Sequence, residues 1–141
     1  MHMFVKKIIH RLITKPRNLF LIDSIGAMLT ALAMFIVLTN FNQYFGIPKI
    51  SFTYLSAIAA CFCLYSMFCF LFLRENFPPF IRIISIANIL YCILITGFLI
   101  QYNAKITNLG LAYFFGEITI ICILVFIELI VANKIKLHEH P

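Results

Sequence analysis

The sequence predicts an all-α membrane protein, a bundle of four transmembrane helices preceded by a short N-terminal amphipathic helix at the membrane interface. Hydrophobic residues make up 63% of the 141-residue chain and charged residues only 11%, whereas a soluble domain is about half apolar and about a quarter charged. The apolar residues gather in four runs, each near the roughly 20 residues that a helix needs to cross a bilayer. The runs lack the apolar–polar alternation of a transmembrane β-barrel.

The first expected element is the interfacial helix, at about residues 4–15. Its apolar residues fall on one half of a helical wheel and its basic residues on the other: Phe4, Val5, Ile8, Ile9, Leu12 and Ile13 against Lys6, Lys7, His10, Arg11 and Lys15. This pattern is typical of a helix in the headgroup layer, with anionic headgroups as partners. Pro16 is expected to end the helix. The helix is interpreted as an anchor that helps to set topology or, alternatively, as a regulated lipid sensor.

The four spans follow as a single membrane domain that comprises residues 1–141. They are expected at about residues 19–38, 52–73, 80–100 and 109–132. The joints between them contain helix breakers, notably Gly46, Pro48, Pro78 and Pro79. Every loop is too short to fold alone, so any chemistry is expected inside the bundle or at its rims.

The positive charges predict the orientation. Nine of the eleven Lys and Arg residues fall on one side of the four spans: Lys6, Lys7, Arg11, Lys15, Arg17, Arg74, Arg82, Lys134 and Lys136. Only Lys49 and Lys105 fall on the other side. Because short loops rich in cations stay on the cytoplasmic side, both termini are expected in the cytoplasm. The net charge of +6 is thus a topology signal, and nucleic acid is not an expected partner because no basic groove with interleaved aromatics is visible.

Two acidic residues are expected near the cytoplasmic face. Asp23 in the first span and Glu128 in the fourth each lie about 6 Å inside that face, at a rise of about 1.5 Å per residue. Arg74 and Arg82 sit at the same level, so the four residues are expected to form an ion-pair layer with arginine–carboxylate contacts. The layer is interpreted as a clasp that sets helix order or, alternatively, as a gate or headgroup site.

Glu117 is the acidic residue without an evident cation at its depth. It lies near the middle of the fourth span and faces the same way as Glu128, because eleven helical steps nearly complete whole turns. A carboxyl group inside a membrane is a functional candidate by default. Asn88, Tyr91 and Thr119 are its expected partners. One interpretation is a structural hydrogen-bond knot, and the other is a site for a proton or a cationic ligand.

Other chemistry is not predicted. The five cysteines all fall in apolar runs, and Cys61 and Cys63 have a C-x-C spacing that points them to different helix faces. The C-terminal His138-Glu139-His140 offers too few ligands for a metal site. No catalytic motif occurs, so neither an enzyme, nor a metal, nor a cofactor is expected.

Four stretches resemble those of a group of small bacterial four-span membrane proteins. They are Leu21-Ile22-Asp23-Ser24-Ile25-Gly26-Ala27, Phe45-Gly46-Ile47-Pro48, Ala87-Asn88-Ile89-Leu90-Tyr91-Cys92, and Gly110-Leu111-Ala112-Tyr113-Phe114 followed by Glu117. The resemblance covers most of the chain and implies a location in a bacterial inner membrane, but no activity.

Two functions are therefore expected. The first is a non-enzymatic structural or accessory bundle that acts through contacts with lipid, another membrane protein or a second copy of the chain. The alternative is a small proton-coupled transporter, or a lipid- or quinone-type pocket protein, that uses Glu117.

Overall fold

The computed structural model describes residues 1–139, and for residues 38, 39, 138 and 139 it describes the backbone alone. Its elements are α1 (His2–Thr14), α2 (Arg17–Ile36), the π-helical segment η1 (Val37–Phe41), α3 (Asn42–Phe45), α4 (Lys49–Phe72), α5 (Phe77–Gln101) and α6 (Asn108–Glu139). In this part of the chain α2, α4, α5 and α6 are long and apolar enough to cross a membrane, with mean hydropathies of 2.1 to 2.5. The expected all-α four-helix fold is confirmed.

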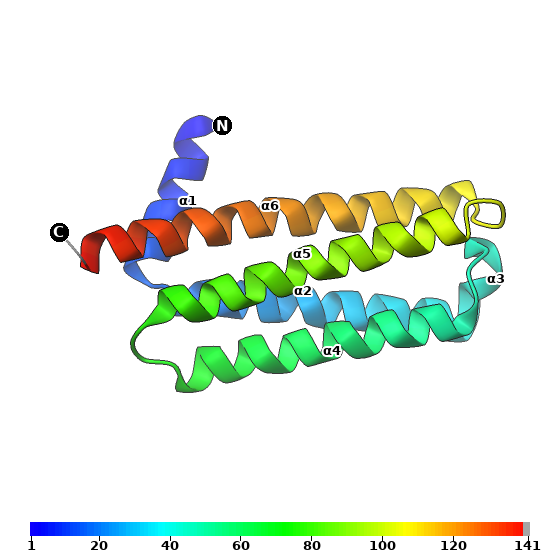
Figure 1. Ribbon diagram of the computed structural model, residues 1–141, viewed down its shortest axis with the longest axis horizontal. Helices are drawn as coiled ribbons and strands as arrows, with labels where there is room; N and C mark the ends of the chain where they lie inside the picture. Colours follow the sequence, from blue (N-terminus) through cyan, green and yellow to red (C-terminus); the bar gives the residue numbers. More distant parts are fainter. Residues whose placement is uncertain (140–141) are drawn as a thin grey trace.

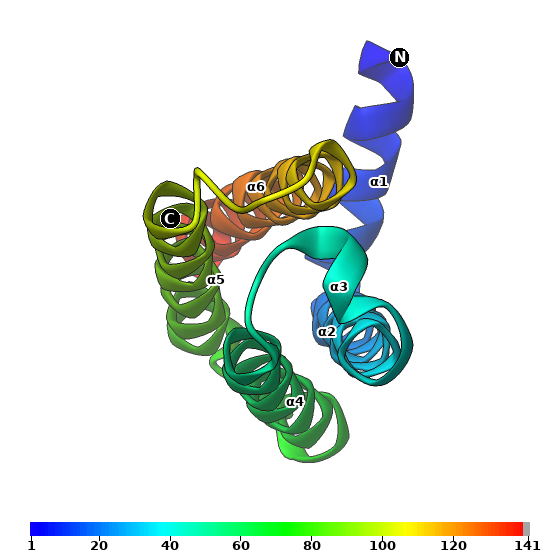
Figure 2. The ribbon, with the colours of Figure 1, turned by 90° about the vertical axis from the view of Figure 1, so that its right-hand side faces the viewer.

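The four long helices run up and down as two antiparallel hairpins, α2–α4 and α5–α6 (Figure 1). Viewed along the bundle, they form a ring in the order α2, α4, α5, α6 (Figure 2). Helix α1, the last turns of α6 and the α4–α5 turn lie at one end, called here the basic end (Figure 1). The short helix α3 and the α5–α6 loop lie at the other, called the α3 end. The ring order makes α2 and α6 neighbours, which matters for the site below.

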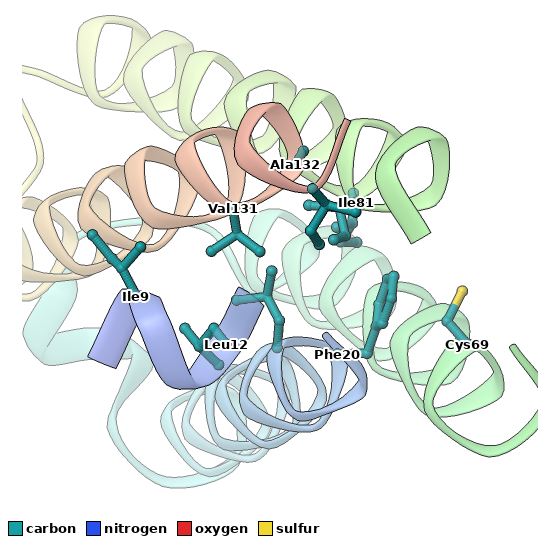
Figure 3. Close-up of a cluster of buried hydrophobic side chains, with 10 residues drawn as sticks. Ile9, Leu12, Phe20, Cys69, Ile81, Val131 and Ala132 are labelled. Carbon is teal, nitrogen blue, oxygen red and sulfur yellow. The ribbon is translucent and has the colours of Figure 1, made fainter. Parts of the chain in front are cut away.

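A cluster of buried apolar side chains closes the basic end. Ile9 and Leu12 of α1 pack there with Phe20 of α2, Ile81 of α5 and Val131 of α6 (Figure 3). Burial of such side chains from several helices favours one helix arrangement over others. The cluster therefore joins the two hairpins and also holds α1.

Helix α1 has the amphipathic pattern expected of it, but its apolar face divides in two. Ile9 and Leu12 are buried against the bundle, whereas Met3, Phe4 and Val5 are exposed. The exposed half of α1 projects beyond the bundle (Figure 2). Docking of the second half against α2 and α6 thus positions the first half beside the bundle.

Arg17 connects the start of α2 to the end of α4. Its guanidinium donates two hydrogen bonds to the backbone carbonyl of Phe70, at 3.0 and 2.8 Å. The guanidinium also lies 5.2 Å from the centre of the Phe70 ring. Carbonyls in the last turn of a helix have no partner within the helix. Arg17 thus supplies one of these carbonyls with donors.

The α3 end is held together by backbone contacts around Gly46. Gly46 follows α3 with a φ of 74°, in the left-handed region. The Thr107 N–H donates to the Phe45 carbonyl at 3.2 Å, and the Thr107 hydroxyl donates to the Tyr44 carbonyl. A Cβ on Gly46 would lie 1.9 Å from the Lys105 carbonyl oxygen. The α3 corner and the α5–α6 loop therefore touch so closely that only glycine fits between them.

Candidate functional site

A cavity of about 400 Å³ lies within the ring of helices and takes lining residues from all four. Its floor comes from α4 and α5, with Ala59, Phe62 and Tyr91. Its rims come from α2 and α6, where the lining residues Leu29 and Ile120 are 59% and 68% exposed. The cavity therefore opens between α2 and α6, on a surface that faces lipid when the helices span a membrane.

Small residues on the rims create this space. Gly26 and Ala27 line the cavity from α2, and Ala112 and Gly116 line it from α6. A Cβ on Gly26 or Gly116 would meet no atom of the described residues within 4 Å. Small side chains often let membrane helices approach closely, but on these two helices they border open volume instead.

Glu117 is buried in the cavity wall, with 8% of its surface exposed. Its Oε1 accepts a long hydrogen bond of 3.4 Å from the Tyr91 hydroxyl. The Tyr91 ring is itself packed edge-on against Phe62, with ring centres 5.8 Å apart. Among the described residues, Glu117 Oε2 has no hydrogen-bond partner. One oxygen of this buried carboxyl is thus left to interact with whatever occupies the cavity.

Asp23 and Glu128 meet deeper in the bundle, toward the basic end. Asp23 accepts hydrogen bonds from the Ser66 hydroxyl and from Asn88 Nδ2, the latter at 3.1 Å. Glu128 Oε2 accepts one from the Ser85 hydroxyl at 2.9 Å. The two carboxyl groups adjoin each other. Asp23 lines the cavity, whereas Glu128 is completely buried behind it.

The arginines of the expected ion-pair layer lie outside it. Arg74 is exposed in the α4–α5 turn, and Arg82 donates to the Asn133 side chain at 2.9 Å. Serine and asparagine side chains occupy the places beside Asp23 and Glu128 where arginine contacts were expected. Neutral hydroxyl and amide donors cost less to bury than a guanidinium, and this difference accounts for the arrangement.

The expected partners of Glu117 also separate. Tyr91 does contact Glu117, but Asn88 turns toward Asp23. Thr119 is exposed and donates to a carbonyl one turn earlier in its own helix, at 2.8 Å. Asn88 nevertheless lines the same cavity as Glu117 and Tyr91, whereas Thr119 lies on the exposed face of α6.

Sequence reasoning missed three residues that shape the site. Ser66 donates to Asp23, and Phe62 and Tyr113 line the cavity. Ser66 carries a detectable signal, because it is a hydroxyl residue well inside an apolar span. Phe62 and Tyr113 carry no such signal, since nothing in the sequence distinguishes them from the other phenylalanines and tyrosines, of which the chain has sixteen and six.

The cysteines and the candidate metal ligands of the described part of the chain form neither a disulfide nor a ligand cluster. No group of three His, Cys, Asp or Glu side chains that could hold a metal ion occurs among the side chains that the structure describes. The cysteines Cys61, Cys63, Cys69, Cys92 and Cys122 are all free thiols. The side chains of His138, Glu139 and His140 fall outside the described residues.

Comparison with protein-family models, with curated proteins and with solved structures finds no match to this chain. The interpretation of the cavity therefore depends on its own geometry and chemistry.

Proposed function

We propose that the protein binds a lipid-soluble molecule in the cavity between α2 and α6, with Glu117 Oε2 as the acceptor for a polar group of the ligand. The observation that supports this most is a carboxyl oxygen without a partner among the described residues, on a side chain that lines a cavity of about 400 Å³. Pockets for small molecules typically measure about 300–1,000 Å³ and combine apolar walls with few polar groups. This cavity fits that description.

The ligand reaches the cavity from within the membrane. The rims carry exposed apolar side chains such as Leu29 and Ile120, which suit contact with lipid tails. A molecule dissolved in the bilayer enters sideways between α2 and α6 without crossing a polar barrier. We infer from this that the ligand is an amphiphile, with an apolar body and a hydrogen-bonding head.

The orientation that we propose places the basic end in the cytoplasm of a bacterial cell, with the protein in its inner membrane. Nine of the eleven lysines and arginines support this orientation through the positive-inside rule. The projecting half of α1 then lies among anionic headgroups. Glu117, nine residues after the start of α6 at Asn108, lies about 13 Å from the α3 end of that helix, in the outer half of the bilayer.

A purely structural bundle is the alternative function. It also fits four apolar helices with exposed surfaces for lipid, a partner protein or a second copy. A structural knot, however, is stabilising when its buried polar groups are satisfied. The free oxygen of Glu117 therefore favours ligand binding.

Filling the cavity should block the ligand. The probe is a photoreactive long-chain alcohol in protein-containing vesicles, because its hydroxyl can donate to Glu117. We expect Gly116→Leu to reduce labelling of Ala59 and Phe62 on the cavity floor by on the order of tenfold, which corresponds to about 1.4 kcal/mol. A Cβ at Gly116 would meet no described atom within 4 Å, and Gly116 lines the cavity, so the added side chain takes up space at the cavity rim. Mass spectrometry of the labelled peptides measures the effect.

Gly97→Leu is the matched control for this experiment. Gly97 is also a glycine inside a long helix, and a Cβ there would meet no described atom within 4 Å. It lines a separate hollow formed by α5 and α6 on another face. We expect labelling of the cavity floor to remain at its original level in Gly97→Leu. Equal labelling in folded Gly116→Leu and in the unmodified protein would contradict the proposed function.

A further inference from the structure

We propose that the ligand of the cavity is a lipophilic cation, and that its binding displaces one proton shared by the carboxyl groups of Asp23 and Glu128. The inference rests on the proposed function, because it names the chemical class of the ligand in the same cavity. It also assigns proton binding to the pair Asp23 and Glu128, of which only Asp23 lines the cavity.

The charge of the cavity wall indicates a cation. Two carboxyl side chains, Asp23 and Glu117, line the same cavity. No Lys, Arg or His side chain of the described residues lines it with them. Carboxyl groups inside a membrane are normally paired with a positive group or neutralised by a proton. A positively charged ligand supplies the missing charge.

The aromatic residues of the wall support the same class of ligand. Phe62, Tyr91 and Tyr113 line the cavity from α4, α5 and α6. A cation near an aromatic ring is attracted by the ring's quadrupole, and the attraction strengthens when water is excluded. Apolar walls, aromatic rings and two carboxyl groups together suit a cation with a large apolar surface better than a neutral lipid.

The hydrogen bonds of the Asp23–Glu128 pair indicate that it holds a proton. The pair has four carboxyl oxygens, and Ser66, Ser85 and Asn88 supply donors to three of them. The fourth oxygen, Glu128 Oε1, is buried and has no donor within the described part of the chain. Two adjoining buried carboxylates repel each other strongly. One proton held between them supplies the missing donor and removes the repulsion.

The groups around the pair do not neutralise it. Ser66 faces it from α4, and Ser85 and Asn88 face it from α5. Arg82, the cation closest to Ser85 along α5, donates to Asn133. The remaining titratable side chains on neighbouring turns of α4 are thiols and a phenol: Cys63, Cys69 and Tyr65. Helix α1 contributes apolar side chains to this end of the bundle.

Asp23 connects the two sites, because it lines the cavity and adjoins Glu128. A cation in the cavity favours the charged form of Asp23 and therefore favours release of the shared proton. The coupling is reciprocal, so a higher proton concentration must weaken cation binding by the same linkage. Exchange of one proton for one cation changes the apparent affinity by about tenfold per pH unit.

Tetraphenylphosphonium is a suitable probe, because its charge is permanent and it carries no exchangeable proton. We expect purified full-length protein in detergent to release about one proton for each probe cation bound. Calorimetry in two buffers that differ in ionisation enthalpy measures this release. Asp23→Asn and Glu128→Gln should each abolish proton release and remove the pH dependence of affinity. Glu75→Gln, which changes an exposed carboxyl in the α4–α5 turn, is the matched control and should behave as the unmodified protein.

Each contrary outcome identifies what fails. Cation binding without proton release would overturn the exchange and leave the proposed function standing. No cation binding by a protein whose cavity is still labelled by the photoreactive alcohol would overturn the cationic class. Absence of both cation binding and labelling by the photoreactive alcohol would mean that the proposed function itself fails. Proton release that persists in Asp23→Asn and Glu128→Gln but disappears in Glu117→Gln would place the displaced proton on Glu117. Proton release on addition of sodium ions, without the probe cation, would make the Asp23–Glu128 pair a metal-ion site.

Discussion

Gly46→Ala should strongly destabilise the α3 end of the bundle. Gly46 has a φ of 74°, and an alanine in left-handed backbone costs roughly 1–2 kcal/mol. The added Cβ would also lie 1.9 Å from the Lys105 carbonyl oxygen, which is backbone and cannot swing aside. We therefore expect the α3 corner and the α5–α6 loop to move apart, with a total cost above that range. Unfolding of the purified protein in mixed micelles of increasing denaturing-detergent content measures the loss.

Gly97→Ala is the control for this substitution. It adds the same methyl group inside α5, where no described atom lies within 4 Å, and it replaces a poor helix former by a good one. We expect stability equal to or slightly above that of the unmodified protein. Equal stability of the Gly46→Ala and Gly97→Ala proteins would contradict the close contact between Gly46 and the Lys105 carbonyl.

Glu117→Gln should separate charge from hydrogen bonding at the cavity. Glutamine has nearly the shape of glutamate and keeps an oxygen that accepts from Tyr91, so we expect the fold to be retained. It lacks the negative charge, and hydrogen bonds or contacts that involve a charged group are worth about 1.5–3 kcal/mol. The affinity for tetraphenylphosphonium should therefore fall by roughly 10- to 100-fold. Labelling by the neutral photoreactive alcohol should persist, because an amide still accepts from a hydroxyl.

The control is again Glu75→Gln, which should leave cation affinity unchanged because Glu75 is exposed and remote from the cavity lining. Unchanged cation affinity in Glu117→Gln would show that the ligand does not use the Glu117 charge. Loss of folding would show that the carboxylate has a structural partner that glutamine cannot replace.

The sequence predicted the helices well, because their signals are local. Each of the four apolar runs became one long helix, and the fourth extends past its expected end at residue 132 to Glu139. That extension carries Lys134 and Lys136, whose polarity suggested a boundary. A helix does not end where its residues become polar, since it can continue into the headgroup region and beyond. Here the continued helix also provides Ile135, which packs in the cluster that holds α1.

The acidic residues show what residue depth in the membrane can predict about side-chain contacts and what it cannot. Asp23 and Glu128 were placed at one level from residue counts, and the structure brings their carboxyl groups together. Counting residues along a helix yields depth, because the rise per residue is constant. It does not yield the rotation of one helix against another. Arg82 was therefore expected beside a carboxylate but donates to Asn133, and Asn88 was expected to bond Glu117 but donates to Asp23.

The sequence alone predicts an integral membrane protein, four helices long and apolar enough to cross, and one orientation, since each prediction depends on composition and on charge along the chain. The cavity between α2 and α6 depends on the tertiary structure. Gly26 and Gly116 lie on different helices, and only the packing of two hairpins decides whether such small residues meet closely or border open volume. The same packing leaves one oxygen of Glu117 and one of Glu128 without a donor among the described residues. Satisfaction of a buried polar group is a property of its three-dimensional neighbours, and local sequence does not encode it.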